Sequence, residues 1–101
     1  MKDNLTFIVI IDDNVDAVLL MEALSKYQYT VKRIDSRLFF IATSDLNDKA
    51  QSIFNKLKEY IKLPNESTLL VSPLDKFYGR LPVETWEWLK ISDNRIKTEE
   101  E

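Results

Sequence analysis

The sequence contains no cysteine, no histidine and only one glycine, Gly79, among its 101 residues. Without cysteine there can be no disulfide framework, zinc–thiolate site or thiol nucleophile. Without histidine, the commonest general base and metal ligand is missing, so serine–histidine and cysteine–histidine catalysis are excluded. One glycine cannot build a glycine-rich phosphate loop, which excludes the Walker and dinucleotide-binding fingerprints. Any chemistry would therefore depend on carboxylates, lysine, tyrosine or hydroxyl groups.

Long hydrophobic runs are also absent, since the longest continuous apolar stretch has five residues. Such a stretch is too short to span a membrane. The N-terminus lacks the basic region, apolar core and small-residue cleavage site of a signal peptide. The net charge of −3 argues against nonspecific nucleic-acid binding by the whole surface, although a local basic patch remains open. We therefore expect a soluble, cytoplasmic protein that does not enter a membrane.

The hydrophobic content of 45%, with 11% aromatic residues, is typical of a folded globular protein. A chain of this length can bury roughly two thirds of its unfolded surface in a single core. The last residues are polar and end in three glutamates. The composition predicts a single domain over residues 1–91 and a disordered acidic tail over residues 92–101.

One stretch organises the chain, and it runs from Leu5 to Asp16 as LTFIVIIDDNVD. A β-branched apolar run that ends abruptly in carboxylates predicts a buried strand opening into a loop and a helix. We expect the strand over Asn4–Ile11, in the centre of a sheet. Asp13 or Asn14 then caps a helix that runs to about Tyr27, with Asp16 in its first turn.

The remaining elements complete a recognisable order. Further segments predict a hairpin turning near Asp35–Ser36, a helix from the Asp45–Asp48 loop to about Lys62, a short strand over Thr68–Val71 and a C-terminal helix opened by Pro82. The order is therefore strand, helix, strand, strand, helix, strand. This predicts an α+β, ferredoxin-like βαββαβ fold, with four antiparallel strands, two helices on one face and a short C-terminal helix.

The first strand is apolar on both sides. Alternation places Phe7, Val9 and Ile11 towards the helices, and Ile8, Ile10 and Asp12 on the opposite face. Two helices cover only one face, and an apolar patch of several hundred Å² is unusual on a monomer. We therefore expect a homodimer, with an interface formed by Ile8, Ile10, Phe77, Tyr78, Trp86 and Trp88. Because the two tryptophans are two positions apart on a helix, one should pack on the core and the other contact the partner.

The chain resembles a known family at several segments: a first strand ending in Ile-Asp before a helix, and the stretches IDSRLFFIAT, LLVSPL and TWEWL. These are similar to the SinR-like proteins, small relatives of the CRISPR-associated Cas-two family that also includes VapD-type toxin nucleases. The resemblance covers about residues 5–90. It implies a ferredoxin-like homodimer whose subunits pack sheet against sheet.

The resemblance also implies a site. Nuclease members of the wider family place an aspartate at the end of the first strand, near the dimer axis, and the matching residue is Asp12. Two Asp12 carboxylates would then bind one divalent metal, Mg²⁺ or Mn²⁺, which activates a water against a phosphodiester. The alternative for Asp12 is a strand-end carboxylate satisfied by water and loop N–H groups. The chain departs from the nuclease pattern in its acidic net charge.

The sequence leaves open both the role of three basic residues and the choice between two functions. Lys32, Arg33 and Arg37 flank the predicted hairpin turn and either contact phosphate or form a solvated basic hairpin. Two functions are compatible with these features. One is a non-catalytic dimeric interaction or regulatory module, used by a phage or mobile element in conflict with its host. The other is a metal-dependent nuclease, or a nucleic-acid-binding scaffold, that uses Asp12.

Overall fold

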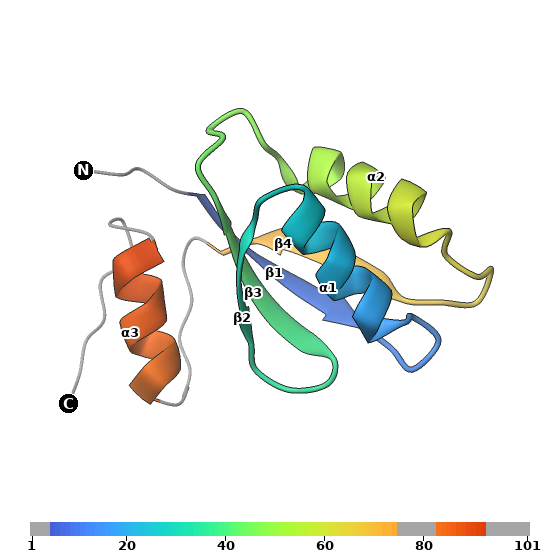
Figure 1. The fold of residues 1–101 in the computed structure, drawn as a ribbon, viewed down its shortest axis with the longest axis horizontal. Helices are drawn as coiled ribbons and strands as arrows, with labels where there is room; N and C mark the ends of the chain where they lie inside the picture. Colours follow the sequence, from blue (N-terminus) through green and yellow to red (C-terminus); the bar gives the residue numbers. More distant parts are fainter. Residues whose placement is uncertain (1–4, 75–82, 93–101) are drawn as a thin grey trace.

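The computed structural model describes residues 5–74 and 83–92 (Figure 1). The elements follow the predicted order: β1 (Leu5–Ile11), α1 (Ala17–Lys26), β2 (Thr30–Arg33), β3 (Leu38–Thr43), α2 (Ala50–Ile61), β4 (Leu69–Pro73) and α3 (Val83–Ser92). The four strands form one antiparallel sheet in the order β2-β3-β1-β4. The ferredoxin-like α+β fold is confirmed, and β1 is a central strand as predicted.

The first face of the sheet, which carries Phe7, Val9 and Ile11, packs against α1 and α2. These three side chains lie in one buried cluster with the apolar sides of both helices. The buried helix residues in that cluster are Leu20, Ala23, Leu24, Ile53, Leu57 and Ile61. The strand alternation therefore places β1 side chains as the sequence predicts.

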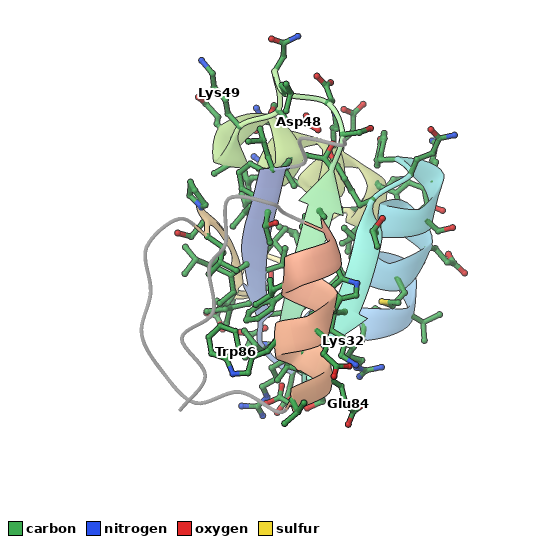
Figure 2. All side chains as sticks on the ribbon, turned by 90° about the vertical axis from the view of Figure 1, so that its left-hand side faces the viewer. Lys32, Asp48, Lys49, Glu84 and Trp86 are labelled. Carbon is green, nitrogen blue, oxygen red and sulfur yellow. The ribbon has the colours of Figure 1, made fainter. Side chains whose placement is uncertain are left out.

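The second face of the sheet carries Ile8, Ile10, Leu38 and Phe40, because the register pairs Ile8 with Phe40 and Ile10 with Leu38. Helix α3 covers part of this face, and Figure 2 shows it lying across the sheet, opposite α1 and α2. Leu89 of α3 is buried together with Phe40 and Leu74. The predicted need for a second copy is therefore reduced, because the chain supplies its own cover.

Both helices on the first face begin differently from the prediction. Asp16 itself is the N-cap of α1, because its carboxylate accepts the backbone N–H groups of Val18 and Leu19 at 2.9 and 3.3 Å. The predicted caps Asp13 and Asn14 lie in the preceding loop. Helix α2 begins only at Ala50, after the Asp45–Asp48 loop, and Leu46 is exposed in that loop.

Two non-glycine residues adopt positive φ angles at helix ends. Gln28, with φ 64°, follows α1, and Lys62, with φ 57°, ends α2. The left-handed region is strained for residues with a Cβ atom. At Lys62 the backbone N–H still bonds the Lys58 carbonyl at 3.0 Å, which closes the last turn.

Several predictions fall outside the part of the chain that the structure describes. These concern Pro82, Phe77, Tyr78 and the acidic tail from residue 93 onward. Among the described residues, no helix is long and apolar enough to cross a membrane.

Candidate functional site

The Asp12 carboxylate lies at the end of β1 and is held by its own surroundings. Its Oδ1 accepts the backbone N–H of Asn14 at 3.0 Å. The Asp12 backbone N–H continues the β1–β4 ladder to the Thr68 carbonyl at 3.3 Å. The Thr68 backbone N–H is the main cause that lowers the pKa of Asp12 below its usual range, and it outweighs the opposing effect of burial. Asp12 is therefore an ionised carboxylate engaged by loop donors.

The other polar residues of this loop serve structural contacts. Asp13 receives two hydrogen bonds from the Arg37 guanidinium, from Nε at 3.1 Å and from Nη2 at 2.5 Å. The Asn14 side-chain amide donates to the Glu66 carbonyl at 2.9 Å, which ties the loop to the segment before β4. With Asp16 capping α1, these side chains fix the path of the loop.

The fit of this loop to a metal ion is poor. Among residues 5–74 and 83–92, no three or more aspartate or glutamate side chains come close enough to hold a cation together. Asp12 already accepts N–H groups, and Asp13 faces a guanidinium. A divalent cation needs several oxygen ligands with free lone pairs. The described residues of one chain therefore do not build a metal centre here.

The three basic residues of the hairpin are not brought together. Lys32 points to the second face, where its Nζ lies 3.8 Å from Glu84 of α3 (Figure 2). Arg33 points to the first face, with its guanidinium 5.4 Å from the Phe39 ring centroid. Arg37 is bound to Asp13. Alternation along β2 separates the first two charges, so this hairpin does not present a single phosphate-binding cluster.

The predicted interface residues in the described part of the chain gather on the second face. Ile8, Trp86 and Trp88 are partly buried and pack against the cluster of Phe40, Leu74 and Leu89. Both tryptophans therefore contact this cluster, so the core contact predicted for one of them is made by both, and the partner contact stays a prediction. Ile10 is half-buried, and its neighbour on β4, Leu70, is 54% exposed.

A buried polar cluster at the opposite end of the sheet was not predicted. Asp48 is buried, and its carboxylate accepts the Thr43 hydroxyl at 2.9 Å and Lys56 Nζ at 3.1 Å. Lys56 Nζ also donates to the Tyr29 hydroxyl at 3.4 Å and lies over the rings of Tyr27 and Tyr29. We call Asp48, Lys56, Tyr29 and Thr43 the Asp48 cluster.

The pKa values in the Asp48 cluster follow from its burial. Burial, and then the nearby Asp48 carboxylate, raise the pKa of the Tyr29 phenol above its usual value. At Lys56, desolvation alone would lower the pKa, but the hydrogen bonds to Asp48 and Tyr29 outweigh it and the pKa is raised. Lys56 therefore stays charged and Tyr29 neutral at physiological pH, which is typical of a structural ion pair and not of a poised base.

Only a weak sequence signal pointed to the Asp48 cluster. The sequence placed Asp48 in the loop that opens the second helix, whereas its side chain turns back to Thr43 and Lys56. The partners lie up to 27 residues apart in the chain. Their meeting depends on how α2 packs on the hairpin, which local pattern does not encode.

The comparisons with known proteins give no match for this chain among family models, curated proteins or solved structures.

Proposed function

We propose that this chain is a non-catalytic interaction or regulatory module that works as a homodimer. The observation that carries the proposal is Leu70, a leucine more than half exposed in the edge strand β4, beside half-buried Ile10. Because Leu70 and Ile10 are paired across the strands, they form adjoining apolar surface that contact with another molecule would bury. The resemblance to SinR-like and Cas-two-like proteins supports the homodimer and a role in conflict between a phage or mobile element and its host.

The engagement of the acidic residues supports a non-catalytic role. Three carboxylates near the end of β1 already accept hydrogen bonds. Asp12 accepts a loop N–H group, Asp13 accepts the Arg37 guanidinium, and Asp16 accepts N–H groups at the start of α1. Asp48 is occupied by Lys56. Catalytic carboxylates generally keep a free oxygen directed at the substrate or metal. The arrangement therefore favours binding over catalysis.

The test of the dimer compares two leucines of similar exposure. Leu70 on the second face is 54% exposed, and Leu46 in the loop before α2 is 58% exposed. Leu70→Glu should convert the wild-type dimer to a monomer, because it places a charge in a dry contact. Leu46→Glu should leave the dimer intact. Sedimentation velocity on all three proteins measures this, and a monomeric wild type at micromolar concentration would refute the dimer.

Asp12 gives one reason to keep nuclease activity as a second candidate. Its pKa is lowered, so it is ionised, and it lies at the strand end that matches the nuclease aspartate. Purified protein should be incubated with RNA and DNA, with Mg²⁺ or Mn²⁺ and with a chelator. The interaction module predicts no chelator-sensitive cleavage. Cleavage that Asp12→Asn abolishes, and that Asp13→Asn retains, would establish the nuclease instead.

A further inference from the structure

Within residues 5–74 and 83–92, the outer edge of β2 has backbone groups that no other strand pairs. Strand β2 lies at one end of the sheet, and among the described residues only β3 pairs with it. The Ile34 N–H donates to the Leu38 carbonyl at 2.9 Å, so the backbone groups of Ile34 face β3. In an antiparallel ladder every second residue does so, and the backbone groups of Thr30 and Lys32 therefore also face β3. The backbone N–H and C=O groups of Val31 and Arg33 consequently point outward. Tyr29 is two residues before Val31, so its backbone N–H also points away from β3, and it donates to the Leu24 carbonyl of α1.

A groove of mixed character lies beside this edge, between helix α1 and Arg33. Val18 and Met21 are its main apolar side chains, and Glu22, Ser25 and Lys26 of α1 also line it. Val18 is 67% exposed and Met21 37%. In an added antiparallel strand, the residues opposite Val31 and Arg33 would share their face and project towards this groove.

The positive charge of Lys32 on β2 favours an acidic partner strand. A second copy that pairs antiparallel in the register opposing Val31 to Arg33 would place Lys32 directly opposite Lys32, and like charges in that position are destabilising. An acidic residue opposite Lys32 would be favourable instead. The existing partner of Lys32, Glu84, is mostly exposed and 3.8 Å away, so it leaves the ammonium able to receive a second carboxylate.

From this geometry we infer that the outer edge of β2, with the α1 groove, binds an extended peptide segment of a partner protein in which apolar residues alternate with acidic ones. The segment adds a fifth strand to the sheet. Its backbone bonds Val31 and Arg33, its apolar side chains cover Val18 and Met21, and its acidic side chains face Lys32. The inference rests on the proposed role as an interaction module and names the partner of a surface separate from the second face.

The test uses three capped synthetic peptides of about six residues, the length of a typical strand. One alternates valine with glutamate, one alternates valine with lysine, and one is the glutamate peptide with N-methylated amides that cannot pair as a strand. Titration into ¹⁵N-labelled protein is followed by NMR. The glutamate peptide should shift the amide signals of Val31 and Arg33 and bind about tenfold more tightly than the lysine peptide. The N-methylated peptide should not bind.

Three variants locate the contact. Val18→Glu should abolish binding, whereas Val83→Glu on α3, where the valine is 68% exposed against 67% for Val18, should not. Lys32→Glu should reverse the preference in favour of the lysine peptide. No saturable shift at Val31 and Arg33 for the glutamate peptide, equal binding of the N-methylated peptide, or loss of binding in Val83→Glu as well would overturn the inference.

The outcome is independent of the dimer. Sedimentation of the same proteins reports the second face, and the peptide titration reports β2. A monomer that binds the glutamate peptide refutes the homodimer and retains the β2 contact. A dimer that does not bind it refutes the β2 contact and retains the homodimer.

Discussion

The two faces of the sheet are covered in different ways. The first face has two helices, α1 and α2, and a continuous cluster of thirteen buried side chains. On the second face, the described residues supply helix α3 and a cluster in which three side chains are buried and five more are partly buried. Packing density determines how much a lost side chain costs. Among residues 5–74 and 83–92, the larger buried cluster therefore lies on the first face, where we expect the larger contribution to stability.

Phe39 and Phe40 allow the sharpest test of this difference. They are adjacent in β3, and both are buried, but Phe39 lies in the first-face cluster and Phe40 in the second-face cluster. Phe39→Ala should lower the free energy of unfolding by about 3–5 kcal/mol. Phe40→Ala should cost about half as much, because its cluster contains fewer buried side chains among the described residues and α3 can adjust. Urea denaturation measures both. Equal losses would show that the two faces are packed alike.

A second comparison concerns the two ends of the sheet, where the buried Asp48 cluster and the exposed Asp13–Arg37 pair should contribute differently to stability. Asp48→Asn removes the charge that holds Lys56 while keeping the shape, and should cost about 1–3 kcal/mol. Asp13→Asn breaks the exposed pair with Arg37 and should change stability little, since exposed ion pairs contribute weakly. Thermal unfolding of both variants compares them. A larger effect from Asp13 would mean that the loop after β1 is the more important anchor.

The same cluster predicts how stability depends on alkaline pH. The pKa values of Tyr29 and Lys56 are both raised in the folded protein. A raised pKa contributes stability that is fully present below the ordinary value, here about 10, and is lost as pH rises through the folded value. The free energy of unfolding should therefore fall above about pH 10.

The matched variant for this pH dependence carries Tyr29→Phe and Lys56→Met together. It should show a shallower fall of stability over the same pH interval. Urea midpoints measured from about pH 8 to about pH 11 provide the curves. Identical slopes for wild type and double variant would place the alkaline transition elsewhere.

The smallest expected effect concerns the end of α1, which leads into β2. Gln28→Gly should stabilise the protein by about 0.5–1 kcal/mol, because glycine adopts positive φ without a Cβ clash. Ser25→Gly, inside α1, should destabilise by a similar amount. Urea denaturation distinguishes the two. A loss of stability in Gln28→Gly would indicate that the Gln28 side chain contributes more than its backbone strain.

Much of the fold was predictable because strand alternation and helix periodicity are local. The parity of β1 placed Phe7, Val9 and Ile11 on the helix side, and the apolar spacing located both long helices. Helix α3 was predicted as an element. Its cover of the second face was not, because the packing of Leu89 on Phe40 depends on how a late segment folds back.

The candidate site was less predictable because it depends on long-range contacts. The predicted caps Asp13 and Asn14 were displaced by Asp16, since Arg37 and the Glu66 carbonyl, distant in sequence, engage the first two. For Asp12 the sequence left two interpretations open, and the hydrogen bond from Asn14 favours the loop role. The separation of Lys32 from Arg33 did follow from alternation along β2 and could have been recognised from the sequence.

The position of α3 at the end of the element order has a consequence for synthesis on the ribosome. A nascent chain emerges N-terminus first, so the βαββαβ unit leaves the ribosome before the helix that covers Phe40. The sheet can form and bury its first face before α3 is able to cover Phe40 on the second face. We expect chaperones to bind the chain mainly during this interval, because the apolar side chains of the second face are then exposed.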